Sequence, residues 1–126
     1  ISYVDGRPML DGGIADSIPV VRATEQGFDN CLVVLTRNAG YRKSAKPSFV
    51  PWFAYRRYPM LQEAIRHRNA EYNKQMELVE RLESEGRITV IRPERPIEVG
   101  RMERDTHRLL ALYNEGYDLA SKVEIR

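Results

Sequence analysis

The feature that most constrains the fold of this chain is a continuous apolar run, Cys31-Leu32-Val33-Val34-Leu35. Its length predicts a strand, and apolar residues at every position are typical of a parallel strand that is covered on both faces. A second strand is expected over residues 88–91, just before Pro93 and Pro96. The run therefore predicts an α/β fold, a three-layer domain of the βαβ type.

Three helices are expected around these strands. A short helix should start at Asp16 or Ser17, with Pro19 in its first turn, and end by Gly27. A long helix should run from about Met60 to Glu83, and its apolar residues recur on one face. These residues are Leu61, Ile65, Tyr72, Met76, Val79 and Leu82.

The last helix is expected to begin near the cap candidate Asp105 and to end by Lys122. Its apolar residues also recur at helical spacing, which predicts that they are buried. They are Leu109, Leu110, Tyr113, Tyr117 and Ala120.

The N-terminal residues predict a short hairpin that delivers Asp11 to a strand end. Strand-forming residues around Val4 are followed by Gly6-Arg7-Pro8, which favours a turn, and then by Met9 and Leu10. Gly12 and Gly13 can take positive φ and allow another backbone or a substrate to approach closely. Asp5, next to Gly6, is interpreted as a turn residue.

The string Leu10-Asp11-Gly12-Gly13-Ile14-Ala15-Asp16-Ser17-Ile18-Pro19 resembles the aspartate motif of the patatin-like phospholipases, which use a Ser-Asp dyad. The resemblance continues through residues 31–36 and Asn38-Ala39-Gly40-Tyr41-Arg42-Lys43. It implies that residues 1–126 are the C-terminal part of a patatin-like three-layer α/β/α fold with a mainly parallel sheet. About 1–45 would carry the motif, and about 46–126 would form a helical and strand extension.

The resemblance assigns Asp11 as the general base that takes the proton of a serine hydroxyl. Gly12, Gly13 and Asp16 would support the motif, and Asp16 is otherwise interpreted as a helix cap or a loop-tying acceptor. Two hypotheses compete with this one: a turn without chemistry, and a two-carboxylate glycosidase site made of Asp11 and Asp16. The sequence spacing of these two residues does not by itself set the distance between their carboxylates.

The serine of the dyad has no candidate in these residues. None of the serines, Ser2, Ser17, Ser44, Ser48, Ser84 and Ser121, lies in the Gly-x-Ser-x-Gly pattern of a nucleophile elbow. The chain also begins with Ile1 inside an expected strand. We therefore expect a fragment whose N-terminal nucleophile half is absent and which is inactive alone toward phospholipids or other lipid esters.

A basic, aromatic segment over residues 37–68 suggests a second function. It holds eight basic residues against the single acidic residue Glu63, a local net charge of +7 in a chain of net charge +2. Tryptophan and tyrosine favour a water–lipid boundary, and cations favour anionic head groups. The alternative function is thus a non-catalytic module that binds anionic lipid or nucleic acid, although +2 is a small charge for a nucleic-acid binder. The contact candidates are Arg42, Lys43, Trp52, Arg56 and Arg57.

Composition bounds the remaining possibilities. The chain has 126 residues, 42% of them hydrophobic and 30% charged, which is typical of one globular domain. Cys31 is expected to be an inert buried thiol, and His67 and His107 are expected at the surface. These residues predict no metal site and no cofactor. No apolar stretch is long enough for a membrane span, which favours a cytoplasmic or peripheral location. A third hypothesis is a structural fragment with exposed core surface.

Overall fold

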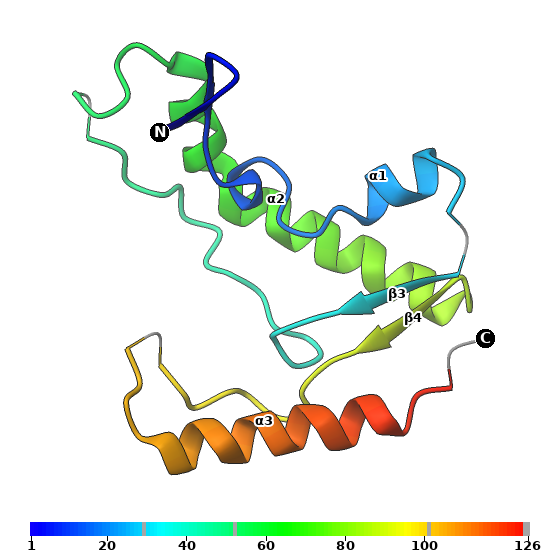
Figure 1. Ribbon diagram of the computed structural model, residues 1–126. Helices are drawn as coiled ribbons and strands as arrows, with labels where there is room; N and C mark the ends of the chain where they lie inside the picture. Colours follow the sequence, from blue (N-terminus) through cyan, green and yellow to red (C-terminus); the bar gives the residue numbers. More distant parts are fainter. Residues whose placement is uncertain (29, 52, 101, 125–126) are drawn as a thin grey trace. The chain divides into compact units, whose positions relative to one another are not determined.

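The computed structural model describes residues 1–28, 30–51, 53–100 and 102–124 (Figure 1). The fold is a mixture of helices and small sheets in two compact units, each built from two stretches of the chain. The first unit is Ile1–Arg22 with Arg42–Glu80, and the second is Ala23–Tyr41 with Arg81–Arg126. Among the described residues, no helix is both long and apolar enough to cross a membrane.

The first unit opens with an antiparallel hairpin of β1 (Ser2–Val4) and β2 (Arg7–Met9). Asp5 and Gly6 form the turn, with φ values of 49° and 74°. The prediction of a turn over residues 6–8 was wrong, and the assignment of Asp5 to the turn was right. Positive φ at both positions is typical of the type I′ two-residue turn, and Asp-Gly tolerates it whereas the ring of proline does not.

The long helix α2 covers Pro59–Ser84, so the prediction of residues 60–83 is confirmed to within one residue at each end. Pro59 suits the first helical position, where no intrahelical N–H is needed. At the other end Gly86 has φ 69°, and the amide of Arg87 donates to the carbonyl of Leu82 at 2.9 Å. Glycine in this conformation ends a helix by satisfying its last carbonyls.

The buried apolar side chains divide between the two units. In the first unit they are Ile18, Val20, Tyr72, Met76 and Val79, of which Met76 and Val79 are completely buried. In the second unit they are Leu35, Leu82 and Ile88. The apolar stripe predicted for α2 is therefore the face that this helix buries from Tyr72 onward.

The second unit contains the parallel pair of β3 (Cys31–Val34) and β4 (Ile88–Ile91), in register from Cys31 opposite Ile88 to Val34 opposite Ile91 (Figure 1). Both strands were predicted, and their parallel pairing agrees with a βαβ arrangement. The prediction that β3 is covered on both faces was wrong. Leu32 and Val34 are exposed, because the described sheet has only two strands and a single covered face. Cys31 is half-buried rather than buried, and its thiol donates to the carbonyl of Phe28 at 3.3 Å.

Helix α1 (Val20–Glu25) is shorter than predicted. It begins after Pro19, not at Asp16 or Ser17, because both of those side chains bond elsewhere in the first unit. Its end agrees with the prediction, since Gly27 has φ 83° and its amide donates to the carbonyl of Thr24 at 3.0 Å.

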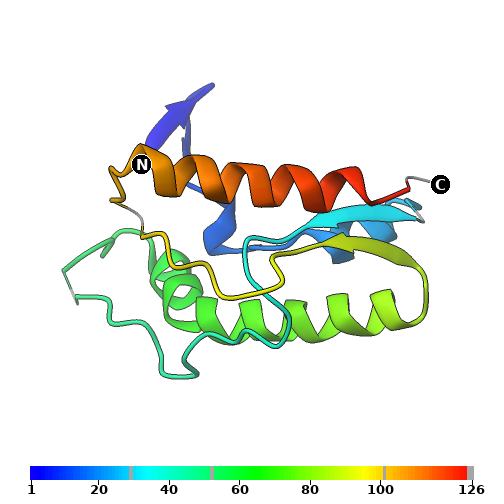
Figure 2. The ribbon, with the colours of Figure 1, turned by 90° about the horizontal axis from the view of Figure 1, so that it is seen from below.

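Helix α3 (Thr106–Ser121) has the predicted cap. The carboxylate of Asp105 accepts from the amide of His107 at 2.9 Å and from that of Arg108 at 3.4 Å. The prediction of a buried face was wrong, because the helix buries no residue and the predicted stripe is exposed. The half-covered side chains lie on another face, where the segment after β4 runs beside the helix (Figure 2). Helical spacing reveals a stripe but not which stripe finds a partner.

Candidate functional site

The Asp-Gly-Gly loop of the first unit is held by several hydrogen bonds. Asp11 follows β2 and caps a single 3₁₀ turn, Gly12–Ile14, with one carboxylate oxygen accepting from the amide of Gly13 at 2.9 Å. This bond fixes the carboxylate relative to the backbone, as in an Asx turn. The Asp11 side chain remains exposed, so a group from outside can reach it.

A side chain at Gly13 would be crowded by its neighbours, although the backbone there has no unusual dihedral angle. A Cβ added there would lie 3.2 Å from the Asp11 carboxylate oxygen and 3.9 Å from a guanidinium nitrogen of Arg68. Neither Gly12 nor Gly13 adopts positive φ, and a Cβ on Gly12 would meet nothing within 4 Å. The groups near Gly13 are thus two side chains of the same chain, and the approach of another backbone or a substrate stays a prediction.

Two side chains of α2 hold this loop from the other side. The guanidinium of Arg68 donates to the carbonyl of Gly13 at 3.0 Å, and the hydroxyl of Ser17 donates to the same carbonyl at 2.8 Å. Gln75 donates to the carboxylate of Asp16 at 2.7 Å and accepts from the amide of Ile18 at 3.0 Å. Arg68 and Gln75 are seven residues apart, so they lie on one face of the helix.

Asp16 is therefore the loop-tying acceptor that was one of its two interpretations, and it caps no helix. Its bond to Gln75 restrains the loop three residues beyond Gly13. Three of these bonds tie the backbone that carries Asp11 to a long helix, and the fourth, from Ser17, closes the loop on itself. What the arrangement offers chemically is one exposed carboxylate at a strand end, held in a defined orientation.

Replacing Gln75 by leucine should lower the free energy of unfolding by about 1–3 kcal/mol, because it leaves the Ile18 amide and the Asp16 carboxylate without their partner. Lys74→Leu, on the exposed side of the same helix turn, should change it by less than about 0.5 kcal/mol. Urea unfolding of both variants measures the difference. In Gln75→Glu two carboxylates meet, so its deficit should shrink as the pH falls below about 5. Equal losses in the leucine variants would show that Gln75 does not restrain the loop.

Two of the predicted anion contacts, Arg42 and Lys43, are engaged within the first unit. Arg42 forms a two-pronged ion pair with Glu80, with N–O distances of 3.0 and 2.6 Å, and this hydrogen-bonded carboxylate raises the pKa of the guanidinium. The ammonium of Lys43 lies 3.8 Å from the ring centroid of Tyr72, and its backbone amide and carbonyl both bond to Asn73. These two residues attach their loop to α2.

The remaining contact candidates lie farther along the same loop. Arg56 and Arg57 are exposed, and with Phe53, Tyr55 and Tyr58 they line a shallow hollow of about 440 Å³. Trp52 lies outside the described residues. His67 and His107 are both exposed, as predicted, and His67 contacts the carboxylate of Glu63 at 2.8 Å.

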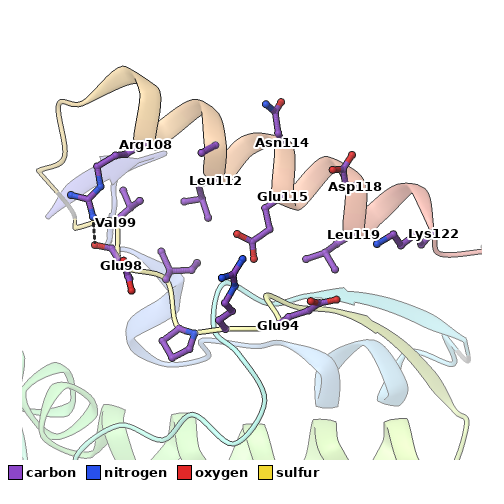
Figure 3. A pocket seen from close by; sticks show the side chains of 14 residues that line it. Glu94, Glu98, Val99, Arg108, Leu112, Asn114, Glu115, Asp118, Leu119 and Lys122 are labelled. Carbon is purple, nitrogen blue, oxygen red and sulfur yellow. Dashed lines mark hydrogen bonds between the residues drawn. The ribbon is translucent and has the colours of Figure 1, made fainter.

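The second unit has a larger groove of about 870 Å³ between α3 and residues 94–99 (Figure 3). Arg108 closes one end by donating to Glu103 at 2.8 Å and to the carbonyl of Glu98 at 3.3 Å. The lining carries four carboxylates and three cations. This mixture favours no ligand of one charge. In the described ranges no three histidine, cysteine or acidic side chains gather as a metal site.

The sequence pattern indicated the loop residues but not the residues of α2 that hydrogen-bond to them. The helix is rich in charged side chains, so the sequence alone suggests that its polar residues face solvent. The residues concerned are Arg68, Asn73, Gln75 and Glu80. A usable signal was their position. Residues 68, 75 and 80 lie close in sequence to the buried side chains at 72, 76 and 79, and polar groups beside a buried stripe are placed to bond a covering loop.

Comparison with known protein families shows which family part of the chain resembles. The profile of a domain family of unknown function, DUF6363, matches residues 58–123, just over half of the chain. The match covers the whole of α2, β4 and α3 and leaves out the Asp-Gly-Gly loop. No curated protein and no solved structure matches the chain.

Proposed function

The chain belongs to the DUF6363 family, a domain family of unknown function, and we propose a function from its own residues: it supplies Asp11 as the general base of a patatin-like Ser-Asp acyl hydrolase. The substrate class is phospholipid or another lipid acyl ester. The nucleophilic serine comes from a Gly-x-Ser-x-Gly segment outside these 126 residues. In this proposal the β3–β4 pair belongs to a larger, mainly parallel sheet in a three-layer fold.

The observation that carries the proposal is the restraint on Asp11. The loop is bonded through Gly13, Asp16 and Ile18 to two side chains of α2, which limits the positions that Asp11 can take. The carboxylate itself stays exposed at a strand end. An exposed group held by a rigid backbone is what a reaction with a second group requires.

The chemistry follows from the properties of a carboxylate. As the serine oxygen forms a bond to the ester carbonyl carbon, its proton passes to Asp11, and the same proton then goes to the leaving alkoxide as the ester C–O bond breaks. Water next repeats these steps on the acyl-serine and releases the fatty acid. An ordinary carboxylate is a weak base, so the segment that carries the serine must also stabilise the oxyanion that forms on the ester carbonyl oxygen.

A fluorophosphonate, which esterifies activated serines, tests the proposal directly. In the full-length natural protein, mass spectrometry should find the adduct on a serine in a Gly-x-Ser-x-Gly sequence. The 126-residue chain alone should remain unlabelled and should not hydrolyse p-nitrophenyl esters. A full-length protein that takes up no reagent and cleaves no lipid ester would overturn the proposal.

A further inference from the structure

The loop before α2 presents large apolar side chains to solvent. Phe49, Phe53 and Met60 are 89%, 68% and 81% exposed, and we name these three the apolar tip. A surface that displays several large apolar side chains close together in the chain often marks an interaction site. Single exposed apolar residues need no explanation, but two phenylalanines and a methionine within twelve residues do.

The charge of this region has one sign. No acidic residue occurs between Asp29 and Glu63, whereas Arg56 and Arg57 lie within the loop and are exposed. We name these two the arginine pair. With the ring of Tyr55 they surround the hollow described above, so cations and apolar rings are presented together. This composition is complementary to a surface that is both anionic and apolar.

The loop is also held in shape before it meets any partner. The amide of Ser48 donates to the carbonyl of Arg66 at 3.2 Å, and the side chain of Gln62 donates to the carbonyl of Ala54 at 2.6 Å. The amide of Tyr58 closes a turn on the carbonyl of Tyr55 at 2.7 Å. A hydrogen bond to Tyr3 of the hairpin raises the pKa of the Tyr58 hydroxyl. A loop held in this way loses little conformational entropy when it binds.

We propose that residues 49–51 and 53–60 dock on an anionic lipid bilayer, with the apolar tip entering the head-group boundary and the arginine pair contacting lipid phosphates. Binding to lipid is independent of catalysis, so it stands or fails separately from the role of Asp11. The proposal also reduces the number of candidate contact residues. Arg42 and Lys43 are already engaged with side chains of α2, whereas Arg56 and Arg57 are exposed and line the hollow in the loop.

Exposed apolar residues also occur on α3, but their surroundings differ. Leu110 and Tyr113 are exposed on a helix that carries Glu115 and Asp118 against Arg108. Carboxylates are repelled by anionic head groups, so this helix does not suit the same partner. Its exposed apolar residues provide a matched control for nonspecific hydrophobic binding.

Cosedimentation of the chain with vesicles tests the docking. Binding to vesicles of 70% phosphatidylcholine and 30% phosphatidylglycerol should exceed binding to pure phosphatidylcholine by tenfold or more and should weaken as salt rises. Arg56→Gln/Arg57→Gln should lower the partition coefficient on the anionic vesicles by roughly 30-fold. Phe49→Ala/Phe53→Ala should lower it by about tenfold or more. Leu110→Ala/Tyr113→Ala should leave it within about twofold of the unchanged chain.

Each other outcome decides against the proposal. Equal binding to both vesicle types, or an equal loss in the α3 control, would overturn it. Two further results would overturn it. One is a chain that does not bind vesicles but dimerises through the apolar tip in sedimentation; the other is a chain that binds a single-stranded oligonucleotide and not lipid. The substituted side chains are exposed, and circular dichroism with thermal melting verifies that each variant is folded.

Discussion

Asp11→Asn in the full-length natural protein should lower kcat for lipid-ester hydrolysis by about 10² to 10⁴, the usual effect of removing a general base. The substitution is nearly isosteric, and the asparagine oxygen can still accept from the amide of Gly13. The loop therefore keeps its shape, and only the ability to take a proton is lost. KM should change little, because Asp11 acts on the serine and not on substrate binding. Steady-state kinetics with a short-chain phospholipid measure both constants.

Asp5→Asn is the matched control for this prediction. Asp5 lies six residues earlier, in the turn of the hairpin that precedes Asp11. Its φ is 49°, a conformation that asparagine also tolerates. Its kcat should remain within about twofold of the unchanged protein. Turnover by Asp11→Asn within a few-fold of the unchanged protein would remove Asp11 from the reaction and leave the loop a structural turn.

Met76→Ala should be the most destabilising of the substitutions considered, because Met76 is completely buried in the first unit. Deleting a buried side chain of this size costs about 2–5 kcal/mol, through lost transfer free energy and the cavity that remains. For a chain of this length the midpoint of thermal unfolding should fall by roughly 6–20 °C. Chemical and thermal unfolding of the chain provide both quantities.

Met60→Ala tests whether burial, rather than residue type, sets that cost. Met60 occupies the second position of the same helix but is 81% exposed. Its replacement should change the free energy of unfolding by less than about 0.5 kcal/mol. Similar losses at both methionines would contradict the core assigned to α2.

Local patterns predicted most of the elements, since their causes lie within a few residues of one another. The apolar spacing over 61–82 and Gly86 predicted α2, the run at 31–35 predicted β3, and Asp105 predicted the start of α3. Helix periodicity, capping and strand propensity act over short sequence distances. The same reasoning placed Asp11 at the end of a strand.

The wrong predictions concern which faces of the helices and strands are buried. The exposed stripe of α3 and the open face of β3 both differ from expectation. For α3, several apolar spacings were available, and the segment after β4 covers a different one from that predicted. A sequence pattern states what could be buried, whereas burial depends on a neighbour that arrives from elsewhere in the chain.

By itself, the sequence determined the extents of α2, β3 and β4, the start of α3 and the position of the exposed Asp11, because each rests on local backbone preferences. Only the tertiary structure decided what holds that aspartate in place. Arg68 and Gln75 reach the loop across 55 and 59 residues of chain, and the ion pair of Arg42 with Glu80 spans 38. Such bonds depend on how a folded helix presents its side chains to a distant loop, and no short-range pattern encodes that geometry.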